Sequence, residues 1–306
     1  MKTTKYLATT LLATTLFVAC SKDSNDEGST EFNDGRLHLF FEKIDSNTKV
    51  LVDPTSPSDA SWVAGEQIDL NGTPCTIACT GSSYYLDGIK PLNVDMYAIY
   101  PASINANGND IAVTNNGATA CAIDVHSYAI DIHPDDGTHD VIFPMAAHTT
   151  ANGTSMLFYH LTGGLKLTLS NTTGHHVTRL VVSATKQDDS PAIYKDLSVS
   201  WSNSTVPGVP GGEPGSISGD QSAQFISDMT LMMNTNDGNG HVTSGVDIED
   251  NGNISFCIPM LAQGLKNLTI DGYNGETQIF HKTKVLTTAT NIERNKMYNI
   301  PTIIID

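Results

Sequence analysis

Seven histidine and aspartate side chains lie close together in one stretch of the sequence and could hold a metal ion. They fall between Val125 and Val141, and zinc and calcium use these residue types as ligands. Their spacing matches no helix-borne zinc motif. Two acidic segments, 237–240 and 247–252, lack the glycine and closing glutamate positions of an EF-hand loop. We therefore predict solvated loops and turns at all three places, and no metal site. The seven residues are His126, Asp131, His133, Asp135, Asp136, His139 and Asp140.

The sequence contains none of the common short motifs for covalent or phosphoryl-transfer chemistry. There is no G-x-S-x-G, no H-E-x-x-H and no P-loop. A carboxylate pair for glycoside hydrolysis arises from folding and not from spacing, so a surface hydrolase is kept only as a third hypothesis. The sequence predicts a protein that is not an enzyme, with no catalytic residue and no cofactor.

The chemistry that the sequence does indicate is a modification of Cys20. Lys2 and Lys5 precede a short apolar run that ends at Ala19. A charged start, an apolar run and a small residue at the cut are the parts of a secretory signal. The run is too short to span a bilayer as a helix. A cysteine directly after Ala19 resembles the lipobox of bacterial lipoproteins, in which this cysteine is acylated, with palmitate for example. An ordinary signal with a chance cysteine is the alternative.

A lipid anchor would hold this protein at a membrane face with its body in water, because several acyl chains bind a bilayer stably. We predict a signal peptide over 1–19 and a lipidated, disordered tether over 20–36, since Ser21–Gly35 lacks aliphatic side chains that could pack. The acidic stretch after the cysteine resembles the surface-export signal of some Gram-negative anaerobes. The predicted location is therefore the outer face of the cell outer membrane.

The charge of the chain excludes one class of partner. The full sequence carries a net charge of −17, and loss of the two signal-peptide lysines lowers it to −19. Such a surface repels nucleic acid, so no nucleic-acid partner is expected.

Four cysteines remain after the signal, and export permits disulfides. If Cys75 and Cys79 share a strand, four steps of about 3.3 Å separate their Cα atoms by about 13 Å, too far for a bridge. Their spacing also lacks the paired CxxC units of a zinc site. We interpret Cys75, Cys79, Cys121 and Cys257 as buried small hydrophobic residues.

Short strands alternating with tight turns must carry any functional side chains. Runs rich in β-branched and aromatic residues recur between Gly, Asn, Asp and Pro clusters, with no sustained helical period. Many short strands at this spacing favour β-sandwiches. The polar patch at 149–153 suggests an N-terminal β-sandwich over 37–153 and a C-terminal β-sandwich over 154–306.

Four segments of the sequence carry motifs that occur together in one known family. The segments are Trp62–Leu70, Tyr97–Pro101, Phe158–Leu167 and Asn295–Ile300. They resemble the W-x-x-G-D-x-I, Y-x-x-Y-P, F-x-H-L-x-x-x-L and closing G-K-x-Y-x-I/L segments of the fimbrillin family of fimbrial lipoproteins, with Glu66 in place of the usual Asp. The resemblance implies an all-β fold of two tandem transthyretin-like Greek-key β-sandwich domains. It also implies assembly with other fimbrial subunits into surface fimbriae.

Three aromatic residues of these motifs also have structural interpretations. Trp62 is expected to anchor a core because aromatic side chains bury a large area. His160 lies between apolar neighbours and is expected to be a core histidine with its hydrogen bonds satisfied. Tyr298 is expected to point inward from its strand.

The resemblance implies that subunits assemble by β-strand exchange. In that scheme an N-terminal strand is removed by proteolysis, and the C-terminal strand of a neighbour fills the exposed groove, a form of β-augmentation. Alternation places Leu37, Leu39 and Phe41 on one face of the first strand, where they would plug the groove. Pro301 cannot donate to a strand ladder, so the last strand is expected at an edge or a bulge. One face of that candidate donor strand would carry Tyr298, Ile300, Thr302 and Ile304.

The processing site departs from the family pattern and leaves two interpretations open. Fimbrillin subunits are cut after an arginine in the loop after the first strand, where this chain has Lys49. Lysine reproduces the two-pronged contacts of arginine poorly, and a cut at Arg36 would leave the plug strand in place. The chain is either cut at Lys49 as a polymerising subunit or left uncut as a fimbrial anchor or accessory protein. The alternative function is a monomeric surface lipoprotein adhesin that binds a host protein or glycan receptor through Trp201 or the loop 206–215.

Overall fold

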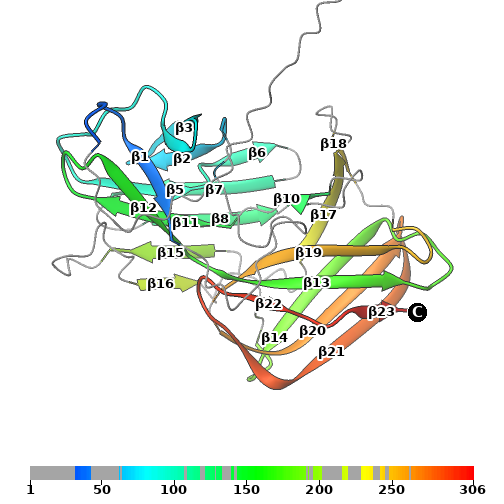
Figure 1. Ribbon diagram of the computed structural model, residues 1–306. Coiled ribbons are helices and arrows are strands. Elements are labelled where there is room, and N and C mark those ends of the chain that lie inside the picture. The colour runs from blue at the N-terminus through cyan, green and yellow to red at the C-terminus, as the bar shows by residue number, and fades with distance from the viewer. Residues whose placement is uncertain are drawn as a thin grey trace, which may run out of the picture.

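The structure is a computed structural model in which every regular element of the described residues is a β-strand (Figure 1). The predicted all-β fold class is therefore confirmed. The described residues are 32–42, 62, 64–106, 109–117, 121–127, 129–132, 139–140, 143–190, 192, 196–201, 216–219, 229–236, 242–244, 248–261 and 263–306.

Seven strands close into a barrel in the first part of the chain. The first strand, β1 (His38–Phe41), completes the ring, because it pairs in parallel with β12 on one side and antiparallel with β4 on the other. Closure removes the free sheet edges that would otherwise attract other strands. In order around the barrel after β1 come β12 (Ser155–His160), β11 (Met145–Thr149), β5 (Met96–Tyr100), β2 (Gln67–Leu70), β3 (Thr73–Thr80) and β4 (Ser83–Leu86).

Strict alternation along the central strands gives the barrel wall two apolar faces. Met96, Ala98 and Tyr100 of β5 point into the barrel core. Ile99 of the same strand and Ala146 of β11 point outward into a second apolar cluster. A five-stranded sheet covers that outer face. It runs in the order β16 (Ser216–Gly219), β15 (Asp196–Ser200), β8 (Cys121–Ser127), β7 (Asn109–Asn115) and β6 (Ile104–Ala106).

The second part of the chain forms two further sheets around a separate core of Leu, Ile, Val and Phe side chains. One sheet centres on β13 (Gly163–Asn171), which pairs with β19 (Asn253–Met260), β22 (Met297–Asn299) and β23 (Ile303–Ile305). The facing sheet runs β10 (His139–Asp140), β9 (Ala129–Ile132), β17 (Met229–Asn236), β14 (Arg179–Lys186), β20 (Gln263–Asn274) and β21 (Thr277–Ile292), with β18 (Val242–Ser244) beside β17.

Several strand pairs cross the predicted division between residues 153 and 154. β12 pairs with β1 and β11 of the barrel. β15 pairs with β8, and β9 pairs in parallel with β17. Segments from each half of the sequence thus complete sheets that belong mainly to the other half.

β12 and β13 join the barrel to the second core with only Leu161 and Thr162 between them. Gly163 is the first residue of β13, and the backbone of residues 293–296 approaches it very closely. A Cβ atom there would lie 2.2 Å from the backbone oxygen of Glu293 and 2.9 Å from that of Lys296. Only glycine lets the 293–296 turn rest on this strand.

We predict that Gly163→Ala destabilises the protein by about 1–3 kcal/mol, because the new methyl group overpacks against backbone that cannot rotate away. Urea unfolding followed by circular dichroism measures the change. Gly264→Ala is the control, since its Cβ would meet Asn291 Oδ1 at an ordinary 3.4 Å. Equal effects of the two substitutions would contradict the close-approach argument.

Candidate functional site

The candidate site is the place that β1 occupies in the barrel wall. Backbone hydrogen bonds hold it on both sides: His38 N–H donates to Thr154 O at 2.9 Å and Glu42 N–H donates to Phe158 O at 2.8 Å, while Leu37 O accepts from Leu86 N–H at 3.0 Å. All three partners are far away in the sequence. β1 therefore lies in a slot between β12 and β4, and residues far away in the sequence form both sides of that slot.

The apolar face of β1 fills the centre of the barrel core. Leu37 and Leu39 are buried, and Phe41 packs half-buried against the same cluster. The Phe41 ring meets Trp62 edge-on at 5.9 Å, and Trp62 meets Phe158 edge-on at 5.0 Å. Each fully buried side chain of this size contributes about 1.5–3 kcal/mol. Trp62 is thus the core anchor that the sequence predicted.

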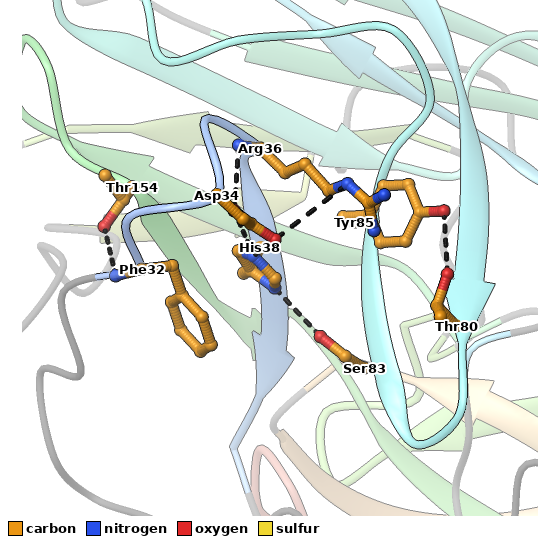
Figure 2. A network of polar contacts seen from close by, with 8 residues as sticks. All are labelled: Phe32, Asp34, Arg36, His38, Thr80, Ser83, Tyr85 and Thr154. Carbon is orange, nitrogen blue, oxygen red and sulfur yellow. Dashed lines mark hydrogen bonds and ion pairs between the residues drawn. The ribbon is translucent and has the colours of Figure 1, made fainter.

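A polar network fastens the start of β1 to the β3–β4 hairpin (Figure 2). The His38 side chain is buried, with Nδ1 2.9 Å from Ser83 Oγ and Nε2 3.1 Å from both carboxylate oxygens of Asp34. The Phe32 ring stacks on the imidazole at 3.7 Å. The hydrogen bond from His38 is the main cause that lowers the pKa of Asp34 below its usual value.

These three residue types also form catalytic triads, but the imidazole here is enclosed. Its residue is only 3 % exposed, and Phe32 covers one face of the ring. A general base must reach the proton that it abstracts. The arrangement of Asp34, His38 and Ser83 instead binds the first turn of chain before β1 to the barrel.

Arg36, one of the two candidate processing residues, takes part in the same fastening. Its guanidinium lies 4.2 Å above the centre of the Tyr85 ring and 3.9 Å from Asp34 Oδ2. Phe32, Asp34 and Arg36, which fall within the predicted disordered tether, therefore contact the barrel. The prediction considered aliphatic residues only, whereas aromatic stacking by Phe32 and a cation–π contact by Arg36 hold this segment.

An ion pair at the other end of β1 connects the barrel to the C-terminal strands. Glu42 Oε1 accepts from Arg294 Nη1 at 2.6 Å and from the backbone N–H of His160 at 2.7 Å. Arg294 Nη1 also donates to His160 O at 3.0 Å. Both charged side chains are largely shielded from solvent. Charge-assisted hydrogen bonds in such a setting are about twice as strong as neutral ones.

The turn that carries Arg294 also positions the first C-terminal strand, β22. Asn295 N–H donates to Thr162 O at 3.1 Å, and Gly164 N–H donates to Lys296 O at 2.9 Å. Met297 then begins β22 opposite Gly164, in parallel with β13. β1 lies alongside β12, and β22 lies alongside β13. The end of β1 and the beginning of β22 therefore meet at one junction, where β12 passes into β13.

His160 lies at this junction and differs from its prediction in one respect. It is buried, as expected for a core residue. Its Nε2 atom, however, has no hydrogen-bond partner among the described residues, so the histidine is not fully satisfied. Burial, assisted by the nearby Arg294 charge, lowers the pKa of His160 to about 4. The ring is therefore neutral at physiological pH.

The buried face of the C-terminal strands differs from the predicted one. Asn299 pairs with Lys166, but Ile303 pairs with Leu169, so the terminal segment advances four residues while β13 advances three. This extra residue, next to Pro301, reverses the alternation. Thr302 and Ile304 are therefore exposed, Tyr298 is half-buried and Ile300 is buried. The other buried side chains are Met297, Ile303 and Ile305.

The expectation that Pro301 marks an edge or a bulge is confirmed. In the described part of the chain, β22 and β23 pair with β13 alone, and the register shift lies between them.

The remaining candidate residues lie away from these strands. Cys20 and Lys49 lie outside the described residues, so lipidation and processing there stay predictions. Trp201 is half-buried and packs beside Tyr97 and His148.

The four cysteines of the described residues form no disulfide with one another. Cys75, Cys121 and Cys257 are buried as predicted, whereas Cys79 is only half-buried because it lies near the end of β3. Burial raises the pKa of Cys257 to about 12. Within the described ranges, no group of three or more potential metal ligands occurs, and no helix is long and apolar enough to cross a membrane.

No motif in the sequence identifies the polar residues that fix β1, namely Asp34, His38, Ser83, Glu42 and Arg294. Alternation placed the apolar face of β1 but gave no information on its polar partners. The only local signal was an acidic residue directly after an apolar strand.

Comparisons with known proteins give only distant structural likenesses. No protein-family model matches the chain, and no curated protein matches it. A candidate cell adhesion protein from Bacteroides ovatus is 12% identical with a TM-score of 0.43, over 88% of this chain and 91% of that chain. A candidate cell adhesion protein from Bacteroides thetaiotaomicron is 9% identical with a TM-score of 0.35, over 88% and 92%.

A fimbrial protein from Bacteroides ovatus is 10% identical with a TM-score of 0.28, over 88% of this chain and 50% of that chain. Identities and TM-scores this low carry no argument about what the present chain does.

We predict that Leu39→Ala destabilises the protein by about 2–5 kcal/mol, because truncation leaves a cavity in the barrel core. Urea unfolding measures the loss. The control is Val285→Ala, at a residue that is 60% exposed, which should change stability by less than about 0.5 kcal/mol. A loss of similarly small size at Leu39 would show that β1 is not an integral part of the core.

We predict that His160 makes the protein less stable in acid. Its folded-state pKa of about 4 lies below the ordinary 6.5, so the unfolded chain takes up the proton first as the pH falls. Stability should decline from pH 6.5 toward pH 4 by up to about 1.4 kcal/mol per pH unit from this group. Unfolding of wild type and His160→Leu at pH 7, 6 and 5 measures it, and an equal pH dependence in both proteins would refute the assignment.

Proposed function

We propose that this protein is a fimbrial subunit, or a fimbrial anchor or accessory lipoprotein, that assembles by β-strand exchange. The observation that carries the proposal is the position of β1. It closes the barrel between β12 and β4, and Leu37 and Leu39 are buried in the core. A barrel that lost this strand would expose a groove shaped for another strand with the same alternation.

The groove would supply both the affinity and the specificity that strand addition needs. The free backbone groups of β12 and β4 would pair with the incoming strand, and apolar core positions would accept its alternate side chains. Trp62 and Phe158 form part of that lining. A barrel left open would also carry the cost of two unpaired edges, so filling the groove would be strongly favoured.

The C-terminal strands are the natural donor. β22 and β23 pair with β13 at the edge of their sheet. Removing β22 and β23 from that edge breaks their pairing with one neighbouring strand, β13, whereas removing β1 from the barrel breaks pairing with two. It would uncover Met297, Ile300, Ile303 and Ile305, and the groove of a neighbouring subunit would bury apolar side chains again.

The role in the fimbria depends on processing. A cut at Lys49 would release β1 as a non-covalently held segment, and the chain would polymerise. A cut at Arg36 would leave Leu37–Phe41 in the barrel. An uncut chain acylated at Cys20 would stay on the cell outer membrane as an anchor or accessory protein. Partners in both cases are other fimbrial subunits, and a host protein or glycan receptor is a further possible partner.

Sequencing the N-terminus of the protein purified from the cells that make it separates these roles. A start at Val50 identifies a polymerising subunit, and a chain blocked at an acylated Cys20 identifies an anchor or accessory protein. A start at an unmodified Cys20 would contradict both roles.

We predict that locking β1 in place stops assembly. Phe40 and Leu157 are register partners on neighbouring strands, whose Cα atoms are about 5 Å apart, within the range for a disulfide. The double variant Phe40→Cys/Leu157→Cys should form that bridge after export and leave cells without filaments in electron microscopy.

Each single variant is the control, and a reducing agent should restore assembly to the double variant. Normal filaments built from the oxidised double variant would overturn strand exchange at β1.

A further inference from the structure

Two six-residue segments at opposite ends of the chain share one pattern. Leu37–Glu42 reads Leu-His-Leu-Phe-Phe-Glu and Pro301–Asp306 reads Pro-Thr-Ile-Ile-Ile-Asp. In each, the second residue is polar, the last is acidic and the other four are apolar. The first segment fills the slot in the barrel, and the second forms the edge of the other core.

The environment of Leu37–Glu42 makes distinct demands at successive positions. Positions 37 and 39 must be apolar because they are buried in the barrel core, and position 41 packs against Trp62. Position 37 contributes its carbonyl, which accepts from Leu86 N–H, a role that proline can fill. Position 42 must accept hydrogen bonds from Arg294 and from the N–H of His160.

Pro301–Asp306 meets these demands in the same order. Ile303 and Ile305, which would match Leu39 and Phe41, already share one inward face, while Ile304 is 57% exposed. Asp306 would match Glu42. In its own subunit Asp306 forms an ion pair with Lys282 at the surface, so an exposed partner holds its carboxylate before exchange.

We propose that Arg294 is the receptor for an acidic side chain at the end of an incoming strand, and that this residue is Asp306 of a second copy of the chain. The second copy's Pro301–Asp306 takes the register of Leu37–Glu42, parallel to β12. This inference rests on the proposed strand exchange and adds its register and its anchor. A strand slipped by one residue would turn its inward side chains outward and would leave Arg294 without a carboxylate.

Arg294 is well placed for this role before any exchange. Its guanidinium lies beside the Tyr159 ring, 5.8 Å from the centroid, and its Nη1 donates to His160 O. These contacts do not involve β1, so they would keep the guanidinium at the end of the groove after Glu42 has left. An apolar groove accepts any strand whose apolar side chains alternate in the same way. A fixed charge at one end of the groove then favours the one register that places a carboxylate beside it.

The test uses the full chain with a specific protease sequence substituted at residues 48–54, cut after folding so that β1 becomes displaceable. The probe is a fluorescein-labelled, amide-capped peptide of residues 297–306, in which the Asp306 side chain is the only carboxylate. Fluorescence anisotropy measures binding at equilibrium. A labelled peptide of residues 32–42 reports on the groove itself, and the uncut chain is the negative control.

The peptide substitution Asp306→Asn should weaken binding about tenfold or more, because it removes a charge-assisted hydrogen bond. Asp306→Glu should retain binding, since it restores the side chain that Glu42 provides. On a cut chain with Arg294→Gln, the native and Asp306→Asn peptides should bind equally. The peptide arm leaves the protein unchanged, so it stays decisive if Arg294→Gln lowers stability.

Three other results have separate meanings. Equal binding of the native and Asp306→Asn peptides to the cut Arg294 chain would overturn the register and anchor but leave strand exchange intact. A cut chain that rebinds the 32–42 peptide but not the 297–306 peptide would overturn the donor, and with it the proposed function. A cut chain that binds neither peptide would overturn the groove itself.

Discussion

The closing of the barrel by β1 is the constraint on which the rest of the structure depends. A sheet of six strands has two edges, and β1 satisfies both with a parallel ladder to β12 and an antiparallel contact with β4. The same strand supplies Leu37 and Leu39 to the core. Because hydrophobic burial and edge pairing coincide in one short segment, the barrel depends on a single strand whose partners lie far away in the sequence.

Different kinds of interaction hold the two ends of β1. Stacking, a cation–π contact and the Asp34–His38–Ser83 hydrogen bonds hold its start (Figure 2). A shielded ion pair with Arg294 holds its end. The first set lies on the barrel alone, whereas the second joins the barrel to the turn before β22. The N-terminal strand and the C-terminal strands are thus physically linked at the junction where β12 passes into β13.

Alternation in the sequence placed the buried face of β1 correctly but not that of the last strand. Leu37, Leu39 and Phe41 lie on the core side because β1 is short and regular. The same rule failed from Thr302 onward because one extra residue beside Pro301 reverses the face. The proline signalled the irregularity, but a period of two carries no information about how many residues a bulge inserts.

The sequence by itself determined the all-β class, the burial of Trp62 and His160, and the inward face of β1, because these follow from local pattern and side-chain size. Only the tertiary structure decided that β1 closes a barrel, that β15 and β9 complete sheets of the opposite half, and that Glu42 meets Arg294. Each of these joins residues far apart in the chain, through hydrogen bonds and charges whose partners no local pattern specifies. Sequence spacing constrains what a strand can bury, and the folded geometry alone selects what it lies beside.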